Sequence, residues 1–351
     1  MEFEIELKLL TNNNARNILE NKLLPTLGGK VTKQEVVLEN YYFDTPKRLL
    51  RKFDMGLRIR VNNNECEQTL KTSGQSIGGL HKRPEFNVSL DNYDQEGAEV
   101  PNLSLFDPSA WPTDFDLVYA QQNLETMFAT NFSRHIYLYE NERSVIEIVS
   151  DMGKVSAANQ SLPICEVELE LKKGNVSELF QLAKKITSSI PTVLGVQSKA
   201  ARGYGLADKV SKPTPILPPQ SMNLLSTTEE RILLLNQVLS HFQHYSSCFG
   251  FESSQLKIKD VEEISKSLSL LSDCLKNLFE NTQFNGFLEL YDESLQLISS
   301  WSSVTINMKV ESGVSFELQE HISEFLTHSQ TLAFQLELIQ VMLEKSWVSS
   351  K

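Results

Sequence analysis

The sequence predicts an α+β protein, in which an antiparallel sheet or barrel with interspersed helices precedes a separate all-helical part. Three observations support this prediction. Short segments that alternate apolar and polar residues dominate the first 207 residues, as half-buried antiparallel strands do. The segment SKPTPILPPQ at 211–220 contains four prolines, which exclude a regular helix or a central strand there. Beyond it, apolar residues recur with a helical period.

The elements of the first part follow one another between short turn signals. The turn signals are NNN at 62–64, GG at 78–79 and DMG at 151–153. Helical periodicity predicts helices at about 12–24, 116–128, 176–190 and 198–207. The alternating segments that predict strands are FEIELKLL, MGLRIRV, ECEQTLKT, RPEFNVSL, RHIYLYE, RSVIEIVSD and ICEVELELK.

The second part predicts a small helical bundle. Its first two helices begin after capping-box pairs, and two further helices are predicted at 287–301 and 316–347. We therefore divide the chain into residues 1–207, a Pro-rich linker at 208–222 and a helical domain at 223–351. The capping-box pairs are Ser226 with Glu229 or Thr227 with Glu230, and Asp260 with Glu263.

The composition excludes several classes of function. The net charge is −12 over 351 residues, which argues against a general binder of nucleic acid or of an anionic membrane surface. No apolar run approaches the roughly 20 residues that span a bilayer, and the charged N-terminus is unlike a signal peptide. We therefore expect a soluble, cytoplasmic protein. The four cysteines, which form no CxxC pair and are expected to be reduced core thiols, are Cys66, Cys165, Cys248 and Cys274.

The charged residues of the predicted strands share one face. In the segment EIELK, Glu4, Glu6 and Lys8 alternate with the aliphatic residues of the same strand. The alternation recurs in most other strands, and the signs are segregated: carboxylates concentrate at 4–6 and 166–170, and basic groups on the strands between them. Like charges on neighbouring strands repel one another, so we expect this arrangement where a ligand neutralises it.

Two interpretations of this pattern remain open. An antiparallel sheet with one solvated face would show the same alternation, but the polar sets contain few of the Ser, Thr and Gln residues that usually dilute such a face. Clustered carboxylates bind a hard divalent cation through oxygen, and clustered Arg and Lys bind phosphate through charge-assisted hydrogen bonds. The charged face is therefore either solvated or a site for a metal with a polyphosphate.

A family resemblance favours the second interpretation. The ExExK motif formed by Glu4, Glu6 and Lys8 resembles the defining motif of the CYTH superfamily, also called triphosphate tunnel metalloenzymes. The resemblance to the superfamily extends in order over residues 1–207 and is specific. Within the superfamily the chain most resembles bacterial inorganic triphosphatases that carry a helical domain after the CYTH domain. The resemblance implies an eight-stranded antiparallel barrel whose charged faces line a tunnel. The further blocks that carry it are NYYFDTP, MGLRIR, TLK, GGLHKRPEFNV, PICEVELEL and SKAARGYGL.

The resemblance implies hydrolysis of tripolyphosphate to pyrophosphate and phosphate with Mg²⁺ or Mn²⁺. Two metals in such a tunnel would activate water for attack on a terminal phosphoryl group. Catalytic roles are implied for Lys8, Glu168 and Glu170, with Glu168 or Glu170 accepting the proton of the water. The implied metal-binding residues are Glu4, Glu6, Asp151, Glu166 and Glu168. The implied phosphate-binding residues are Lys8, Arg58, Arg60, Lys71, Arg83, Arg134, Lys199 and Arg202.

The remaining candidates in the first part have simpler interpretations. Residues 41–45, YYFDT, precede Pro46 and are interpreted as strand packing and a turn. His81 follows the Gly-Gly turn and is expected to be a solvated loop residue. His135 is a weaker phosphate-binding candidate than its neighbour Arg134.

The helical part resembles, by its position, the conserved-histidine α-helical (CHAD) domain, which is associated with polyphosphate binding. From residue 206 onward the chain has 18 acidic and 10 basic residues, a net charge of −8, and an acidic bundle repels polyanions. We therefore expect a degenerate or truncated CHAD-like domain with a scaffolding or interaction role. Its histidines, expected at the surface or in packing rather than as ligands, are His241, His244, His321 and His328.

The predicted function is metal-dependent hydrolysis of inorganic tripolyphosphate, a small-molecule substrate, with no nucleic-acid or membrane partner. A CYTH-type adenylate cyclase, or a nucleoside or thiamine triphosphatase, would need an apolar or hydrogen-bonding slot for an organic group beside the phosphates. A non-catalytic triphosphate sensor would lack a catalytic carboxylate, and the implied set is complete in this chain. The sequence leaves the oligomeric state open.

Overall fold

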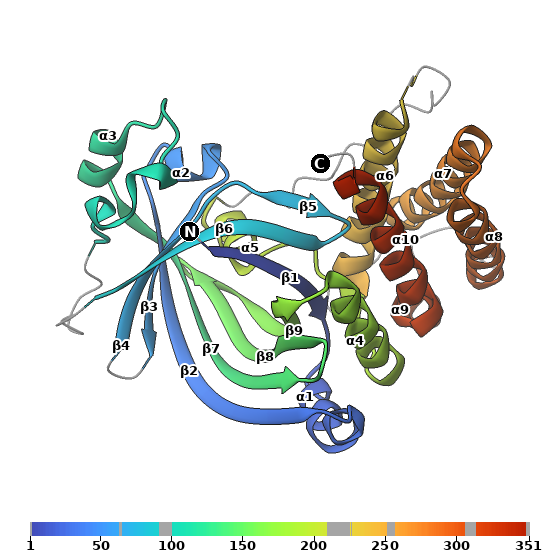
Figure 1. Ribbon diagram of the computed structural model, residues 1–351, viewed down its shortest axis with the longest axis horizontal. Helices are drawn as coiled ribbons and strands as arrows, with labels where there is room; N and C mark the ends of the chain where they lie inside the picture. The colour runs from blue at the N-terminus through green and yellow to red at the C-terminus, as the bar shows by residue number, and fades with distance from the viewer. Residues whose placement is uncertain are drawn as a thin grey trace.

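The computed structural model describes residues 2–62, 65–90, 100–208, 225, 227–250, 257–305 and 314–348. Within these ranges an antiparallel β-barrel is followed by an all-helical region (Figure 1). The fold class predicted from the sequence is therefore confirmed. The predicted Pro-rich linker lies outside the described residues except for Asp208, so the domain boundaries stay predictions.

The barrel consists of eight long strands within the described residues, and all neighbours are antiparallel. Pairing between the first and the last strand of the series closes it, and two short strands, β5 (Gln75–Ile77) and β10 (Val193–Leu194), extend it at that seam. Around the barrel the strands are β1 (Glu2–Leu10), β9 (Gln160–Gly174), β8 (Ser144–Ala157), β7 (Glu125–Glu140), β2 (Lys30–Asp44), β3 (Gly56–Asn62), β4 (Glu65–Lys71) and β6 (Leu80–Ser89).

Strand β1 shows how the sequence builds the barrel wall. Leu7 and Leu9 are fully buried in a hydrophobic core outside the barrel, whereas Glu4 and Glu6 line the cavity inside it. Successive side chains of a strand point to opposite faces, so every residue of the charged set takes the inner side once the aliphatic set is outside. The charged face of EIELK therefore lines the barrel interior and is not a face exposed to bulk solvent.

Within the described residues, short helices α1 to α4 lie on the outside of the barrel, whereas helix α5 packs against its inner face. The segment 103–122 packs over the outer faces of β3 and β4 in one core. Helix α5 packs in another core against Phe132 of β7 and Val155 of β8, which alternate in phase with the inward residues Arg134 and Asp151. Each cover buries an apolar strand face, and that burial stabilises the wall. The helices are α1 (Ala15–Ile18, continued by a π-turn at Leu19–Leu23), α2 (Leu49–Lys52), α3 (Leu117–Gln122), α4 (Val176–Ser189) and α5 (Lys199–Ala207).

Two local predictions for the barrel are wrong. The helix predicted at 116–128 ends at Gln122, because β7 begins at Glu125 and pairs along its length with β2. The turn predicted at 151–153 lies inside β8. A Cβ at Gly153 would lie 2.1 Å from the backbone oxygen of Asn131 on β7, so this glycine permits two strands to approach closely and does not mark a turn.

The helical region contains five helices within the described residues: α6 (Thr228–Gly250), α7 (Ile258–Thr282), α8 (Asn285–Thr305), α9 (Phe316–Thr327) and α10 (Ser329–Val348). The capping box of Thr227 and Glu230 is confirmed, with reciprocal N–H···O distances of 3.1 and 3.2 Å. The pair of Asp260 and Glu263 is not a capping box, because Asp260 lies in the first turn and accepts from the Lys257 N–H at 2.9 Å. The helix predicted at 316–347 is two helices that meet at the extended residue His328.

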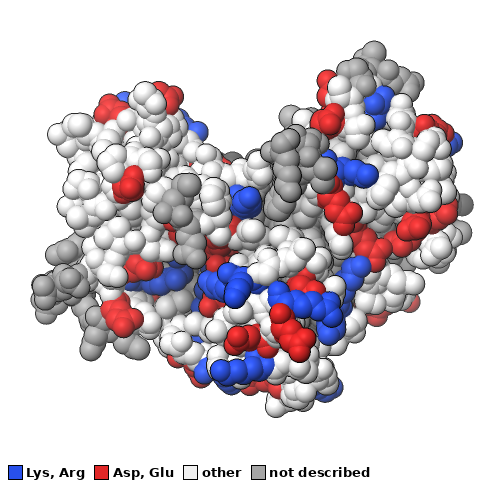
Figure 2. Space-filling model, viewed as in Figure 1, with Lys and Arg blue, Asp and Glu red and all other residues white. Residues whose placement is uncertain are grey.

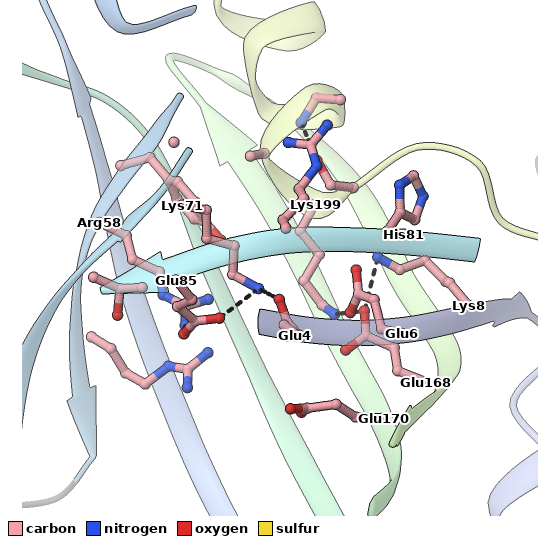
Figure 3. Close-up of a pocket in the computed structure, with 18 of the residues that line it drawn as sticks. Glu4, Glu6, Lys8, Arg58, Lys71, His81, Glu85, Glu168, Glu170 and Lys199 are labelled. Atoms are coloured by element: carbon pink, nitrogen blue, oxygen red, sulfur yellow. Dashed lines mark hydrogen bonds and ion pairs between the residues drawn. The ribbon is translucent and has the colours of Figure 1, made fainter. Parts of the chain in front are cut away.

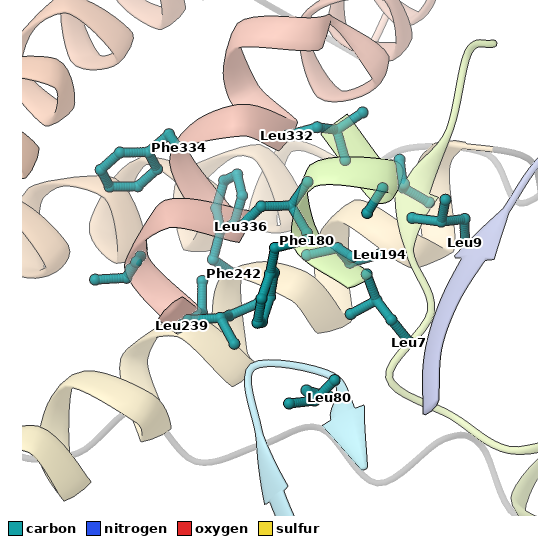
Figure 4. Close-up of a cluster of buried hydrophobic side chains, with 14 of the residues drawn as sticks. Leu7, Leu9, Leu80, Phe180, Leu194, Leu239, Phe242, Leu332, Phe334 and Leu336 are labelled. Atoms are coloured by element: carbon teal, nitrogen blue, oxygen red, sulfur yellow. The ribbon is translucent and has the colours of Figure 1, made fainter. Parts of the chain in front are cut away.

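The helical region packs directly on the outside of the barrel. Leu7, Leu80 and Leu194 of the barrel strands belong to the same hydrophobic core as Phe180 of α4 and Phe242 of α6 (Figure 4). Helix α10 packs along α4, and α6 packs beside β10. The barrel wall behind β1 is therefore covered by helices from both parts of the chain.

The outer surface has charges of both signs. On the face shown in Figure 2, Lys and Arg side chains are interspersed with Asp and Glu, and no broad field of one sign is visible. The helices of the described chain are all too short or too polar to cross a membrane. Of the four cysteines, Cys66 and Cys274 are buried and Cys165 is half-buried, and all three are free.

Candidate active site

The charged faces of the strands converge on a cavity of about 570 Å³ inside the barrel. Figure 3 shows Glu4 and Glu6 of β1 near Glu168 and Glu170, with Lys199 of α5 reaching in from above. Eleven of the residues predicted from the sequence line this cavity: Glu4, Glu6, Lys8, Arg58, Arg60, Lys71, Arg83, Arg134, Glu168, Glu170 and Lys199. The structure therefore brings together groups from β1, β3, β4, β6, β7, β9 and α5.

One side of the cavity carries a row of carboxylates. Glu6, Glu170 and Glu147 occupy directly opposed positions on the neighbouring strands β1, β9 and β8. Opposed like charges destabilise a sheet. Burial raises the pKa of Glu170 and raises that of Glu4, two residues along β1, to about 7, although Lys71 partly counteracts the shift at Glu4. At Glu4 and Glu170 the positive charge nearby does not offset burial, which is the condition that favours a bound cation. At Glu6, by contrast, burial is outweighed, chiefly by Lys8, and the pKa is lowered.

Another side of the cavity carries a cluster of guanidinium groups. Burial, followed by repulsion from Arg58 and Arg134, lowers the pKa of Arg60 to about 9. The Nε of Arg60 donates to the neutral amide oxygen of Asn40 at 2.9 Å, and no carboxylate of the described residues forms an ion pair with Arg60. An anion placed among these three arginines would relieve their repulsion.

Lys71 links the acidic and the basic sides. Its Nζ forms ion pairs with Glu4 and, at 3.2 Å, with Glu85, and Arg58 lies 3.8 Å from Glu85. Burial opposes ionisation of Glu85, but Lys71 and Arg58 outweigh burial and lower its pKa to about 2. Glu85 is therefore an ionised counter-ion that holds two basic residues at the cavity wall.

A second acidic cluster lies beside the cavity, on the inward faces of β8 and β9. Carboxylate oxygens of Asp151, Glu166 and Glu168 lie within 4.8 Å of one another, and Asp151 and Glu166 are fully buried. The Nζ of Lys199 sits among them, 2.7 Å from Asp151 and 3.1 Å from Glu168, and also pairs with Glu166. The ammonium group therefore occupies the position that a metal ion would take in this cluster.

Basic residues on three sides hold this cluster ionised. Arg134 binds Asp151 through two hydrogen bonds of 2.8 and 2.7 Å, and Arg202 pairs with Glu166 at 3.0 Å. Burial opposes ionisation of Glu168, but Lys199, Lys8 and Arg134 together lower its pKa well below the usual range. Of the predicted site residues, Asp151, Glu166 and Arg202 do not line the cavity.

Several cavity residues were absent from the candidates chosen by sequence. Glu85 and Glu147 share the inward alternation of their strands with chosen residues, so period two alone could have identified them. His81, expected to be a solvated loop residue, lies on β6 opposite Glu6 and lines the cavity. Burial lowers its pKa to about 4. Lys172 also lines the cavity and lies 2.7 Å from Glu170.

The turn after β2 is built as predicted, with one difference. Asp44 accepts from the N–H groups of Thr45, Leu50 and Arg51 at 2.7, 2.9 and 3.1 Å, which fixes the turn and starts α2. Phe43 is buried in the outer core, but Tyr42 lines the cavity. The segment therefore packs the strand and also contributes to the cavity wall.

The histidines outside the barrel interior have partners of their own. His135 lies 2.8 Å from Glu20 and 3.0 Å from Glu35 on the outer side. In the helical region His241 is buried, with Nδ1 2.7 Å from the Ser267 hydroxyl. These positions agree with packing roles.

Comparisons with known proteins agree with this geometry. A model of the CYTH domain matches residues 2–204. An inorganic triphosphatase of Haemophilus influenzae is 37% identical over 177 residues, which cover 50% of this chain and 47% of that protein. The chain therefore spans about half the length of this curated relative.

Three solved structures illustrate a distant similarity. A Hippeastrum protein with a dominant triphosphatase activity is 16% identical and has a TM-score of 0.41, covering 61% of this chain and 98% of that one. An inorganic triphosphatase is 16% identical with a TM-score of 0.21, covering 51% and 80%. An RNA triphosphatase of S. pombe is 12% identical with a TM-score of 0.24, covering 59% and 80%. Similarities at these TM-scores support no conclusion about this chain.

Proposed function

The chain belongs to the CYTH domain family, and we propose that it hydrolyses inorganic tripolyphosphate to pyrophosphate and phosphate inside the barrel, with Mg²⁺ or Mn²⁺. The observation that carries the proposal is the separation of charge in the cavity, with Glu4 and Glu170, whose pKa values are raised, on one side and Arg60, whose pKa is lowered, on another. The similarity to an inorganic triphosphatase over half of the chain supports it.

The basic residues are proposed to bind the phosphate chain. Arg58, Arg60 and Arg134 approach the cavity from neighbouring parts of the wall, and their guanidinium groups match the geometry of phosphate oxygens. Lysine supplies a point charge on a flexible stem, which suits Lys71 at the junction of the acidic and basic sides. Lys8, Arg83 and Lys199 line the same cavity and complete the proposed set.

The carboxylates that open into the cavity fit a divalent metal. Glu4, Glu6 and Glu170 provide oxygen donors of the kind that Mg²⁺ and Mn²⁺ prefer. The pKa values of Glu4 and Glu170 are raised because Lys71 and Lys172 do not fully offset the burial of these two groups. When bound, the metal would screen the phosphoryl oxygens and lower the pKa of a water molecule. Binding at Asp151 and Glu166 stays a prediction, and it requires Lys199 to move out of its place between them.

Glu170 is the better placed of the two candidate proton acceptors. The oxygens of Glu168 are engaged by Lys8 at 2.8 Å, Arg134 at 3.0 Å and Lys199 at 3.1 Å, which leaves it little basicity. Glu170 pairs with Lys172, which is more than a third exposed. We therefore assign proton acceptance from the attacking water to Glu170. Lys8 is assigned the role of holding Glu168 and neutralising a phosphoryl oxygen.

The aromatic groups of the cavity wall favour an inorganic substrate over an organic one. The ring of Tyr42 stacks on Phe128 at 4.6 Å, and Lys199 lies over the ring of Phe132 at 5.1 Å. Arg51 lies 4.7 Å over the ring of Tyr204. Each of these three rings already has a face covered, so a nucleoside or thiamine moiety finds reduced stacking surface on them.

The test is phosphate release from four substrates: tripolyphosphate, ATP, thiamine triphosphate and long-chain polyphosphate. Each is offered with Mg²⁺ or Mn²⁺, and a matched assay contains a chelator. We expect the highest kcat/KM with tripolyphosphate, and no release in the chelator. A higher kcat/KM with ATP or thiamine triphosphate would show that the preferred substrate is an organic triphosphate and would contradict the proposal. Binding of tripolyphosphate without release would make the protein a sensor.

A further inference from the structure

The β5–β6 hairpin inserts its turn into the helical region (Figure 1). The turn residues Gly78 and Gly79 have positive φ angles of 55° and 92°, which favours glycine. A Cβ at Gly78 would lie 2.3 Å from Cγ1 of Ile339 on α10 and 2.8 Å from Cδ2 of Leu239 on α6. The side chains of two helices therefore contact the turn itself.

Polar side chains of α6 bind the backbone of this turn. The Gly78 N–H donates to Oδ1 of Asn236 at 2.9 Å, and Nε2 of Gln243 donates to the Gly78 carbonyl at 2.8 Å. Nδ2 of Asn236 also donates to the Ser76 carbonyl at 3.4 Å. Gln243 is fully buried, and a buried hydrogen bond to backbone is costly to leave unmade. Both polar backbone groups of Gly78 are therefore held by one helix.

The clamped hairpin leads directly into the cavity. His81 follows Gly78 by three residues and lines the cavity opposite Glu6, and Arg83 lines it opposite Glu4. Arg83 forms an ion pair of 3.3 Å with Asp54, and the side chain of Asp54 is largely exposed. A shift of the turn would be transmitted along β6 to His81 and Arg83, because a strand moves as a unit.

We propose that Asn236 and Gln243 of the helical region are positioning residues of the cavity. They fix the β5–β6 hairpin, and through it they fix His81 and Arg83 relative to the carboxylates of β1. A bundle that only covered the barrel would need apolar contacts alone, whereas these hydrogen bonds also set the location of one turn. The catalytic part of this proposal rests on the proposed function.

The experiment compares four full-length variants with the wild type. Asn236→Leu and Gln243→Met remove the bonds to Gly78, and Asn236→Asp keeps an oxygen that accepts the Gly78 N–H. Glu337→Gln is the matched control, because it breaks the 2.6 Å pair with Lys184 between α10 and α4 without touching the hairpin. The readouts are hydrogen exchange of amides 76–83, calorimetric binding of tripolyphosphate without metal, and KM and kcat.

We expect Asn236→Leu and Gln243→Met to speed exchange in the hairpin and to weaken tripolyphosphate binding and raise KM by on the order of tenfold. Asn236→Asp keeps the bond from the Gly78 N–H and loses the longer one to the Ser76 carbonyl, so it should fall between the wild type and Asn236→Leu, and Glu337→Gln should stay near the wild-type values. Asn236 is only half-buried, so its variants keep the test informative if Gln243→Met does not fold.

Two results would overturn the positioning role. One is faster exchange in the hairpin with unchanged binding and KM. The other is an equal loss in Glu337→Gln, which would indicate general loosening of the interface. A wild-type protein that binds tripolyphosphate without hydrolysing it would overturn the proposed function alone, and the binding affinities of the variants would then decide the positioning role.

Discussion

Arg60 illustrates how a single residue indicates a ligand. Arg60 is half-buried beside Arg58 and Arg134, its pKa is lowered to about 9 by desolvation and by those two neighbours, and its Nε donates to a neutral amide. A residue placed for stability would have a carboxylate partner. The unfavourable free energy of holding Arg60 beside two other arginines is offset when a polyanion binds. We therefore expect Arg60 to contribute to ligand binding and not to the stability of the fold.

Arg60→Gln tests this expectation. The change should raise KM for tripolyphosphate on the order of ten- to a hundredfold, because a charge-assisted hydrogen bond is lost, while the thermal midpoint stays equal or rises through relief of repulsion. Steady-state kinetics and thermal unfolding measure both, with the exposed Arg143→Gln as control. A lower midpoint with unchanged KM would mean that Arg60 serves folding.

Glu4 makes stability depend on pH with a defined sign. Burial raises its pKa from 4.5 to about 7 in the folded protein, so the folded state holds a proton that the unfolded state releases between those values. The favourable contribution of Glu4 is fully present below pH 4.5 and is lost as pH rises through 7, on the order of 2–3 kcal/mol. His81, whose pKa is lowered to about 4, acts in the opposite direction.

The difference between wild type and Glu4→Gln isolates this effect, because His81 is present in both. The variant should gain stability relative to wild type as pH rises from 4.5 to 8. Added Mg²⁺ should stabilise the wild type more at pH 8 than at pH 5, and at pH 8 it should stabilise the variant less than the wild type. Thermal unfolding of both proteins across that pH range provides the measurement. Parallel curves of stability against pH for wild type and variant would show that folding does not raise the pKa of Glu4.

At the scale of elements, period two determined most of what the sequence could predict. It assigned Glu4, Glu6 and Lys8 to one face, and it located most of the strands that the structure contains. It failed at Gly153, because a glycine can mark either a turn or a close approach of two strands. It also failed at Gln122, where a short helix ends and a strand begins three residues later. Spacing also cannot show that Lys199 meets Asp151, since only the tertiary packing of α5 against β8 brings them together.

Gly153→Ala tests the close approach of β7 and β8. The new methyl group would lie 2.1 Å from the Asn131 oxygen and 2.5 Å from the Phe132 Cα, both backbone atoms that can move little. We expect a loss of about 1–3 kcal/mol in the free energy of unfolding, as overpacking causes. Gly56→Ala, which meets nothing within 4 Å, is the control in chemical denaturation, and equal stability of the two variants would contradict the account.

At the scale of the whole molecule, the barrel and the helical region share one hydrophobic core. The helical period predicted that α6 and α10 have apolar faces. It could not predict that these faces pack on the barrel, because periodicity indicates which face of a helix is buried and not which element covers it. The net charge of −8 after residue 206 fits a region that binds the barrel through apolar and hydrogen-bonded contacts. The helical region is thus part of the architecture that holds the cavity.

Removal of the helical region tests the shared core. A chain that ends at residue 208 would expose Leu80, Phe180 and Leu194, which are buried in the intact protein. We expect it to unfold at a lower temperature than the full chain, to bind a hydrophobic dye and to aggregate. A truncated chain that stays monomeric with an unchanged thermal midpoint would show that the barrel does not depend on this contact.

The most direct test of the central claim, that the charged interior of the barrel binds metal and triphosphate, is Mg²⁺-dependent tripolyphosphate hydrolysis by Glu4→Gln/Glu6→Gln. The control is Glu229→Gln/Glu324→Gln, which removes two exposed carboxylates for an equal change in charge. We predict that the interior variant folds and loses on the order of a hundredfold or more in rate, because the metal supplies several kcal/mol of transition-state stabilisation. The control should keep its rate. A folded interior variant with the wild-type rate would contradict the claim.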